Sequence, residues 1–497
     1  METETLEDHV RRATRNFTSG LPEDQVLALG RDLARELARA HAESPPRHPD
    51  LDPRAIVMSG GVPRLEGGAA TGGDSAYDIF LLGALLTSLA TAAEPDVSWR
   101  LDGPPEAPLS TLSRKAILAA LCAPRRADRY PTASAAAAAL EAALSAAPPD
   151  AASWPLFRGD PGRTGARPGP AAASLLPLWE AATGAVVASP IVAGAVVLAA
   201  TADGRLIWLD KGSGRVLHQM RLGTAVESSP ALGEDARTLH AGTDDGEMVG
   251  VDIVEGKERY RAKVGRLVRS SPLPLAGRVI VGVLEGKSGG MLLAVDAAKG
   301  ATAWARKMGQ VFSSPALAGA SVLVGSDEGV VYAVDPAKGA VVWSSKVGGK
   351  VRATPAVAGD TAIVADFAGH VRALRLADGV TAWTAELGHP LYSSPSVRAD
   401  LAVLGCNEGH LHGVDIRTGA AVFEVKTRGP VVASPAMSGD RIVYGSTDGS
   451  LYLVDTQGRV ADRRELAPAG IQSSPALDGD LVFVGSARGV HALRLVP

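Results

Sequence analysis

The stretch SSPALAGASVLVGSDEGVVYAVDPAKGAVVW, residues 313–343, decides the fold of this chain because it recurs eight times with small changes. A Ser/Thr-Pro dipeptide marks each copy, and the prolines are Pro190, Pro230, Pro272, Pro315, Pro355, Pro395, Pro435 and Pro475. The copies follow one another at 40, 42, 43, 40, 40, 40 and 40 residues. So regular a spacing indicates one structural unit repeated along the chain.

Each copy reads as short strands separated by turns. After the dipeptide come a polar turn and an apolar strand such as Ser321–Val324, then a turn (Ser326–Gly329) and an alternating strand (Val330–Asp335). A strand carrying an aromatic residue ends the copy, as in Val341–Val347. Asp-Gly and Glu-Gly turns between alternating runs favour hairpins. Four short strands per repeat predict one blade, and the fold class is therefore mainly β, an eight-bladed β-propeller over residues 171–497.

An aromatic residue stands four positions after a glycine in most copies: Gly256/Tyr260, Gly300/Trp304, Gly339/Trp343, Gly379/Trp383 and Gly419/Phe423. Two copies depart from this pattern, with His218 after Gly214 and Asp462 after Gly458. A ring at a fixed place in each blade can pack between neighbouring sheets and bury about 150–250 Å². We therefore expect a structural role for these rings.

The two ends of the repeat region predict how the ring closes. The last copy ends after the strand Gly489–Val496 and lacks an aromatic strand, while a spare one, Leu176–Glu180 with Trp179, precedes the first copy. We predict that this early strand completes the last blade, which would leave only short, protected edges.

The stretches Ala294–Trp304 and Ala333–Trp343 resemble the tryptophan-docking repeat of pyrroloquinoline-quinone-like (PQQ-like) propellers, and Trp154–Asp160 resembles their first segment. The style is that of the non-enzymatic members, similar to the outer-membrane assembly factor BamB. One fold hosts many activities, so the resemblance implies the fold far more than a function.

If this chain were a catalytic member of that family, the resemblance would imply a Ca²⁺ held by Glu, Asn and Asp, an Asp that acts as base, and often a disulfide between adjacent cysteines. Cys406 has no cysteine beside it, and most acidic residues lie in turns such as Asp244–Gly246 and Asp448–Gly449, where they favour tight turns. We assign no catalytic residue, no Ca²⁺ ligand and no cofactor.

The remaining candidates for a metal site are cysteines and histidines. Cys122 and Cys406 lie in different predicted domains, so we expect neither a disulfide nor a cysteine-based metal site. Four histidines cluster in the sequence, namely His370, His389, His410 and His412. His410 and His412 point to the same face of a strand, but a metal needs three or four convergent ligands. We expect surface or rim histidines and no metal.

Residues 1–146 predict an all-α domain, and residues 147–170 a linker with the first segment of the propeller. Helical periodicity is clear in Pro22–Ala42, Ser75–Ala93, Ser110–Cys122 and Thr132–Ala146.

The order of motifs in this domain resembles the C-terminal lobe of a bacterial Ser/Thr protein kinase. His48-Pro49-Asp50 stands in place of the catalytic loop, Ile56–Met58 in place of the following strand, and Leu65-Glu66-Gly67 in the region of the DFG triad. Asp78 and Gly83 match the helix that anchors that lobe. The alternative is an ordinary Ala-rich helical domain that matches by chance.

The departures from the kinase pattern exclude phosphoryl transfer. That chemistry needs a glycine-rich loop, a phosphate-binding Lys and Mg²⁺ ligands, whereas here Asp52 and Ala55 replace the loop's Lys and Asn. We therefore interpret His48, Asp50 and Glu66 as a degenerate remnant in a domain kept for binding or regulation.

Charge and hydropathy limit the classes of partner that this chain is expected to bind. The net charge is −4, and residues 1–148 hold 15 Lys and Arg against 20 Asp and Glu, so no basic field favours nucleic acid or an anionic membrane. Met1–Ser19 is charged throughout and Ile79–Ala93 is too short to span a bilayer. We expect a cytoplasmic monomer.

These features favour a non-enzymatic scaffold whose propeller face docks a protein partner, with the kinase-like remnant as a second interaction module. Two alternatives stay open at this point: a PQQ- and Ca²⁺-dependent oxidoreductase, and a nucleotide-binding regulatory pseudokinase.

Overall fold

The computed structural model describes residues 4–5, 23–42, 56–59, 62–65, 75–91, 121, 130, 132–144 and 154–497 except 287. The chain divides into two compact units, Met1–Pro148 and Pro149–Pro497. Among the residues in these ranges, no helix has the length and apolar character needed to cross a membrane.

The first unit combines three described helices with a small sheet. The helices are α2 (Glu23–His41), α3 (Ser75–Thr91) and α6 (Ala133–Leu144), and the sheet has the order β1 (Glu4–Thr5), β2 (Ile56–Ser59), β3 (Val62–Leu65). Leu33, Leu82 and Leu140 share one core, and α2 also buries Val26 and Leu37. The sheet corrects the expectation of an all-α domain. Only Gly60 and Gly61 separate its two long strands in the sequence, a pairing that favours a hairpin.

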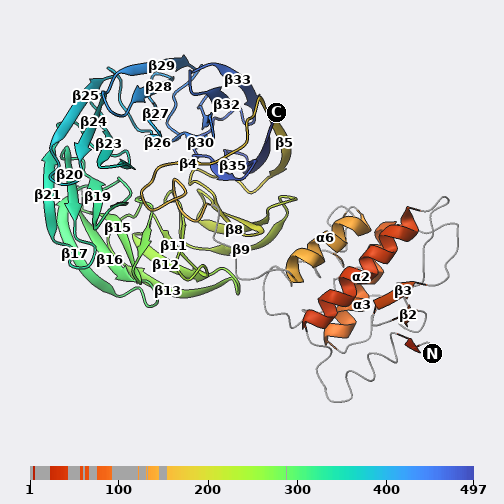
Figure 1. The fold of residues 1–497 in the computed structure, drawn as a ribbon. Coiled ribbons are helices and arrows are strands. Elements are labelled where there is room, and N and C mark those ends of the chain that lie inside the picture. Colours follow the sequence, from red (N-terminus) through yellow and green to blue (C-terminus); the bar gives the residue numbers. More distant parts are fainter. Residues whose placement is uncertain are drawn as a thin grey trace. The chain divides into compact units, whose positions relative to one another are not determined.

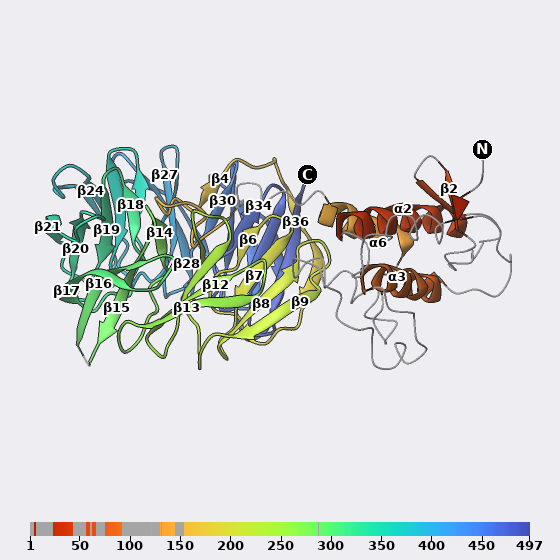
Figure 2. The same ribbon diagram turned by 90° about the horizontal axis from the view of Figure 1, so that it is seen from below.

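The second unit is the predicted eight-bladed propeller, seen along its axis in Figure 1 and edge-on in Figure 2. Blade 1 holds β6 (Ile191–Ala193), β7 (Val196–Ala200), β8 (Arg205–Asp210) and β9 (Val216–Arg221), and blade 2 holds β10 (Ala231–Leu232), β11 (Thr238–Gly242), β12 (Glu247–Asp252) and β13 (Lys257–Lys263). Blade 3 holds β14 (Leu273–Leu275), β15 (Arg278–Glu285), β16 (Gly289–Asp296) and β17 (Thr302–Gly309), and blade 4 holds β18 (Ala316–Ala318), β19 (Ser321–Gly325), β20 (Val330–Val334) and β21 (Val341–Lys346).

The second half of the ring repeats this plan. Blade 5 holds β22 (Ala356–Ala358), β23 (Thr361–Ala365), β24 (His370–Arg375) and β25 (Thr381–Glu386), and blade 6 holds β26 (Ser396–Arg398), β27 (Leu401–Gly405), β28 (His410–Asp415) and β29 (Ala421–Lys426). Blade 7 holds β30 (Ala436–Ser438), β31 (Arg441–Gly445), β32 (Ser450–Asp455) and β33 (Val460–Glu465), and blade 8 holds β34 (Ala476–Asp478), β35 (Leu481–Gly485), β36 (Val490–Val496) and β5 (Ser174–Ala181).

Blade 8 closes the ring as predicted. Its outer strand, β5, comes from the N-terminal end of the propeller and pairs antiparallel with β36, with Trp179 opposite Ala492. A further short strand, β4 (Ala166–Arg167), pairs parallel with the inner strand of blade 7. The two ends of the repeat region are therefore joined by backbone hydrogen bonds, and no blade is left with a missing strand.

The repeated aromatic residues pack between neighbouring blades, which confirms their structural role. The indole N–H of Trp304, in blade 3, donates to the carbonyl of Pro336 in the next blade, blade 4, at 2.9 Å. A Cβ built on Gly339, whose φ is +66°, would lie 2.5 Å from the Trp304 ring. The glycine is thus required twice, for its left-handed backbone and for the ring that lies on it.

In blade 1, the copy with His218 in place of the aromatic residue, a tryptophan on another strand takes over the docking role. Its ring is carried by the third strand instead of the fourth, because Trp208 of β8 lies opposite His218 of β9. The Trp208 indole donates to the carbonyl of Ile253 in blade 2 at 3.0 Å, the same kind of bond that Trp304 makes. The docking tryptophan of blade 1 therefore lies on the third strand, but it contacts the next blade in the same way as the tryptophans on the fourth strand of other blades.

Candidate binding site

A single segment, residues 154–167, fills the centre of the propeller; we call it the axial segment. It runs across the middle of the ring in Figure 1 and pairs with the inner strands one after another. Val192, Val357 and Val397 donate their backbone N–H to the carbonyls of Trp154, Gly162 and Thr164 at 2.9, 3.0 and 2.8 Å. Because these bonds reach blades 1, 5 and 6, one short stretch of chain ties opposite sides of the ring together.

Two buried arginines of the axial segment hold the repeated prolines. Arg163 donates to the carbonyls of Pro315 and Pro272 at 2.8 and 2.9 Å, and Arg158 donates to those of Pro435 and Pro395, both at 2.5 Å. Burial lowers the pKa of both arginines, and the nearby Asp160 carboxylate raises it. These guanidinium groups are committed to backbone carbonyls, so they serve the fold and do not form a free anion site.

The Ser/Thr of each dipeptide forms a closed circle of hydrogen bonds around the axis. The backbone N–H of each one donates to the side-chain oxygen of its counterpart in the next blade; the residues are Ser189, Ser229, Ser271, Ser314, Thr354, Ser394, Ser434 and Ser474. All are buried. The sequence motif that marks the repeat is therefore also the contact that joins the blades.

Side chains two positions before each of these Ser or Thr vary from blade to blade, and we call them the rim residues. They are Val187, Glu227, Arg269, Phe312, Arg352, Tyr392, Val432 and Gln472. They lie in the loops that lead into the inner strands, and neighbours touch, since Arg269 Nη2 lies 3.0 Å from Glu227 Oε1. An invariant circle next to a varied one is the arrangement expected of a scaffold that presents a specific surface.

Arg352 organises the richest part of this rim, across three blades. Its guanidinium lies 4.3 Å from the ring centre of Phe312 and 5.3 Å from that of Phe367. It pairs with Asp327 at 2.7 Å and donates to the hydroxyl of Tyr392 at 3.2 Å. The hydrogen bonds that Arg352 donates to the Asp327 carboxylate are the main cause that raises the pKa of Arg352. The Arg352 side chain is thus held by four neighbours within the propeller itself.

Tyr392 is the exposed member of this group. Its ring meets that of Phe367 edge to face at 4.2 Å, yet the residue keeps 40% of its surface exposed. A ring held rigid on one side and open on the other loses little conformational entropy on binding. We call Phe312, Arg352, Phe367 and Tyr392 the aromatic–arginine cluster.

The quinone implied by the PQQ-like resemblance does not fit these residues. Among the rim residues the only carboxylate is Glu227, and it already pairs with Arg269, so the Glu/Asn/Asp set expected around Ca²⁺ is not assembled there. Cys406 is a free, buried cysteine. The other side of the axis is occupied by the axial segment and its two arginines.

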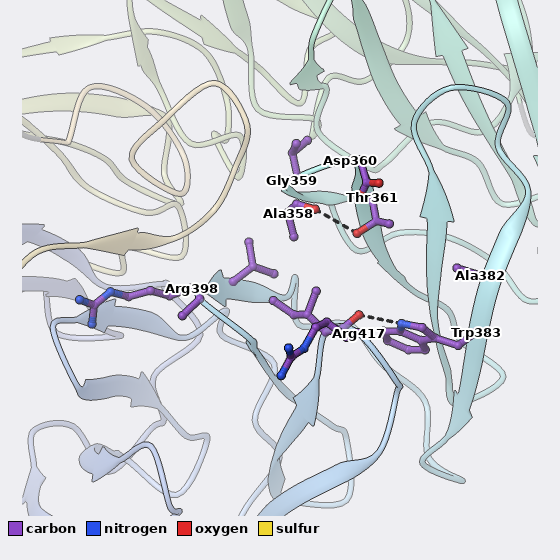
Figure 3. A pocket seen from close by; sticks show the side chains of 12 residues that line it. Ala358, Gly359, Asp360, Thr361, Ala382, Trp383, Arg398 and Arg417 are labelled. Carbon is purple, nitrogen blue, oxygen red and sulfur yellow. Dashed lines mark hydrogen bonds between the residues drawn. The ribbon is translucent and has the colours of Figure 1, made fainter.

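A recess of about 530 Å³ lies between blades 5 and 6, beside Asp360 and Arg417 in turns and Arg398 at the end of β26 (Figure 3). Trp383 forms part of its wall and donates to the carbonyl of Ile416 at 2.7 Å. The wall of this recess is therefore formed by the same tryptophan contact between blades that is seen elsewhere in the ring. It offers no cluster of convergent acid, base or nucleophilic groups among its lining residues.

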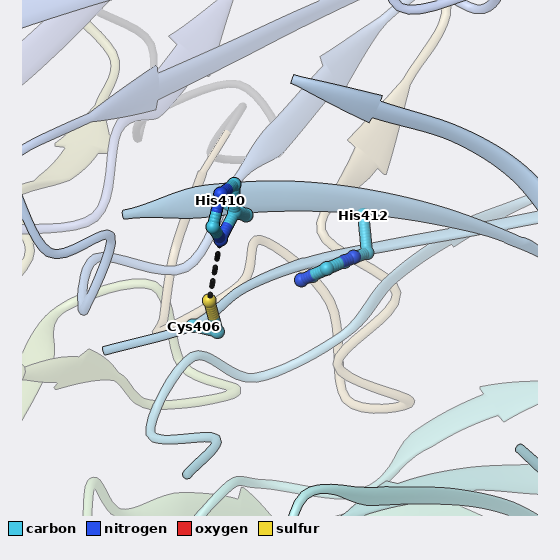
Figure 4. A group of neighbouring side chains, drawn as sticks. All are labelled: Cys406, His410 and His412. Atoms are coloured by element: carbon cyan, nitrogen blue, oxygen red, sulfur yellow. Dashed lines mark hydrogen bonds between the residues drawn. The ribbon is translucent and has the colours of Figure 1, made fainter. Parts of the chain in front are cut away.

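The structure brings together three of the histidines considered from the sequence, since the ring of His389 stacks on that of His410 at 5.8 Å and His412 follows, and a cysteine lies beside them. His410 and His412 lie on the same strand, β28, and project to one face as expected, next to Cys406 (Figure 4). His412 is buried, which corrects the expectation that it lies at the surface or rim. The sequence signal for this contact is the spacing of Cys406 and His410, four residues apart, whereas the prediction considered only pairs of cysteines. His370 lies apart from them, against Asp366.

The kinase-like residues His48, Asp50 and Glu66 and the predicted helix Ser110–Cys122, apart from residue 121, lie outside the described residues. Asp78, in contrast, is buried at the start of α3 and lies 2.8 Å from Nε2 of His41 at the end of α2. This contact links two helices of the first unit.

Comparison with known proteins shows the fold. A family model described as beta-alanine-activating enzyme, beta-propeller matches residues 182–486. BamB from Moraxella catarrhalis is 20% identical over 65% of this chain and 98% of its own, with a TM-score of 0.53. A europium-containing methanol dehydrogenase (15% identity, 68% and 90% coverage) and the quinohemoprotein alcohol dehydrogenase from Comamonas testosteroni (14%, 69% and 81%) both reach a TM-score of 0.58. No curated protein matched the sequence.

Proposed function

This chain belongs to the β-propeller family described as beta-alanine-activating enzyme, beta-propeller, and we propose that within this fold it is a non-enzymatic scaffold that binds a protein partner. Family membership shows the propeller fold and leaves the activity open, because one fold hosts unrelated functions. The solved structures of similar fold include named dehydrogenases at low identity, so the proposal rests on the site of this chain itself.

The observation that carries the proposal is the aromatic–arginine cluster. Tyr, Trp and Arg dominate the energetic centres of protein interfaces, and here an exposed Tyr392 is braced by Phe367 and Arg352. The eight rim residues assemble no catalytic set, and their charges are paired, Arg269 with Glu227 and Arg352 with the neighbouring Asp327. A rigid, partly apolar surface with paired charges at its edge suits recognition of another protein.

The first unit is proposed as a second interaction module, derived from the C-terminal lobe of a protein kinase. Its support is the order of elements, in which α2 precedes the hairpin β2–β3 and α3 follows it. Nucleotide binding is not part of the proposal, because the sequence lacks the phosphate loop and Mg²⁺ ligands. Calorimetry with ATP and Mg²⁺ on the full chain is expected to give no binding heat; measurable binding would favour a regulatory pseudokinase.

Site-specific photo-crosslinking tests the docking surface. A photoreactive phenylalanine analogue in place of Tyr392 should yield one discrete protein adduct in the source cells. The same analogue at Val422, an exposed residue on the outer strand of blade 6, should not. Arg352→Ala should remove the adduct, whereas the matched change Arg398→Ala, beside the recess between blades 5 and 6, should keep it.

Equal adducts from both positions, or none from Tyr392, would contradict docking at this cluster. Adducts from Val422 alone would move the partner to the outer wall of the propeller.

A further inference from the structure

Three side chains able to bind a metal meet on the hairpin between β27 and β28 in blade 6. Cys406 directly follows β27, while His410 and His412 lie on β28, and Figure 4 shows Cys406 beneath His410 with the His412 ring beside them. One ligand atom from each lies within 4.8 Å of the others. Sγ of Cys406 is 3.8 Å from Nδ1 of His410, near the roughly 3.5 Å that separates sulfur and nitrogen ligands around tetrahedral zinc.

A carboxylate sits on the opposite side of both imidazoles. Glu424 of β29 faces His412 across the strand pair, and its oxygens lie 3.6 Å from Nε2 of His410 and 3.7 Å from Nδ1 of His412. Histidines that bind metals commonly direct their other ring nitrogen to a carboxylate, which sets the tautomer. These distances are longer than a hydrogen bond, but they place the carboxylate beside Nε2 of His410 and Nδ1 of His412, so the other ring nitrogens, Nδ1 of His410 and Nε2 of His412, are the ones left for a common ligand.

Nε2 of His412 supplies an independent sign of a missing ligand. The residue is only 5% exposed, and this nitrogen is buried without a hydrogen-bond partner. Leaving a buried polar atom unpaired costs about 1–3 kcal/mol. The centres of the His410 and His412 rings are 5.9 Å apart.

Blade 5 shows how the same three positions look without a metal-binding set. They hold Asp366, His370 and Arg372. The Arg372 guanidinium lies 2.5 Å from the Asp366 carboxylate, and Nδ1 of His370 lies 3.2 Å from it. That cluster satisfies its own charges, with a cation in the place of the second imidazole, whereas the blade 6 cluster offers three neutral or acidic ligands.

We propose that Cys406, His410 and His412 bind a single transition-metal ion of the zinc class, through one thiolate and two imidazole nitrogens, with Glu424 orienting the imidazoles and water in the fourth position. Thiolate and imidazole suit Zn²⁺ and exclude a preference for Ca²⁺ or Mg²⁺, which take oxygen ligands. The ion would stabilise the β27–β28 hairpin of blade 6. The proposal stands apart from partner binding, because it uses none of the aromatic–arginine cluster.

The test uses the full chain, stripped with a chelator and then dialysed against Zn²⁺ or Co²⁺. We expect one retained zinc per chain by elemental mass spectrometry. Bound Co²⁺ should produce a sulfur-to-cobalt charge-transfer absorption band, which reports a thiolate ligand directly. Glu424→Gln should weaken zinc binding by about 10–100-fold, and loss of a ligand should weaken it further.

The repeat supplies variants that fit the fold. Cys406→Ser introduces the residue found at the equivalent Ser326 and Ser446, and His412→Tyr introduces that of Tyr452. Cys406→Ser should abolish the cobalt band and His412→Tyr should abolish zinc retention. The controls Cys122→Ser and His370→Ser should keep both signals, because neither residue belongs to the cluster.

Absence of retained zinc, cobalt binding without the sulfur band, or unchanged binding in both cluster variants would overturn the proposal. Thermal melting of each variant checks that it is folded. If Cys406→Ser does not fold, the result with His412→Tyr decides.

Discussion

The backbone N–H of Ser474 donates to Oγ of Ser189 at 3.2 Å, although 285 residues separate them in the chain. This bond joins blade 8 to blade 1 and completes the circle of eight Ser and Thr contacts. It shows that closure of the ring depends on its inner edge as well as on β5 at its outer edge.

Ser189→Ala should lower the free energy of unfolding by about 1–3 kcal/mol, because it leaves the buried N–H of Ser474 without an acceptor. Chemical denaturation of the two proteins measures the difference. Ser344→Ala, at an exposed position of β21, is the matched control and should change stability little. Equal effects of the two substitutions would contradict the prediction that the hydrogen-bonded circle stabilises the ring.

Gly339→Ala should destabilise the propeller more than Gly319→Ala. Both glycines have positive φ, +66° and +58°, but a Cβ at Gly339 would lie 2.5 Å from Trp304, and one at Gly319 would meet nothing within 4 Å. The backbone strain is shared, so the difference isolates the packing of the ring and should be about 1–3 kcal/mol. Thermal and denaturant unfolding of both variants provide the comparison; no difference would mean that the tryptophan simply moves aside.

Arg163→Met should cost about 2–4 kcal/mol of stability, because charge-assisted hydrogen bonds to the carbonyls of Pro315 and Pro272 are lost together in the buried centre. Arg398→Met, at an exposed position, should be close to neutral. The experiment is equilibrium unfolding of the two variants beside the parent protein. If both behave alike, the axial segment contributes little to the ring.

His240 should make stability depend on pH between about 6.5 and about 4. It is fully buried, and desolvation lowers its pKa from 6.5 to about 4. As the pH falls below about 6.5 the unfolded chain takes up a proton that the native protein refuses, so stability is present above this range and is lost on acidification. The loss is up to about 3 kcal/mol.

His240→Leu, which matches Leu323 of blade 4, should flatten this dependence when unfolding is measured at pH 7 and pH 4. Tyr260→Phe removes the hydroxyl 2.9 Å from Nδ1 of His240 while keeping the buried imidazole, so it should retain the pH dependence. An unchanged slope in the leucine variant would assign the acid sensitivity to other groups.

The sequence by itself determined the number of blades, the strand pattern that they share, the aromatic docking residue of most of them and the closing strand Leu176–Glu180. These features follow from turn chemistry and alternation within 40 residues, which act locally. The same local signal found the first helix and the strand at Ile56–Met58. The partner strand β3 was missed although only Gly60-Gly61 separates it from β2, and the pairing with β1 joins residues far apart in sequence.

Only the tertiary structure decided what lies at the centre and on the rim. The bonds of Arg158 and Arg163 to four blades, and the meeting of Arg352 with Phe312 and Tyr392, span 40 to 277 residues and exist only once the ring has closed. Cys406, His410 and His412 are close in sequence, yet the burial of His412 and the position of Glu424 come from strand pairing. Local patterns specify strands, whereas burial and the convergence of side chains arise from packing between them.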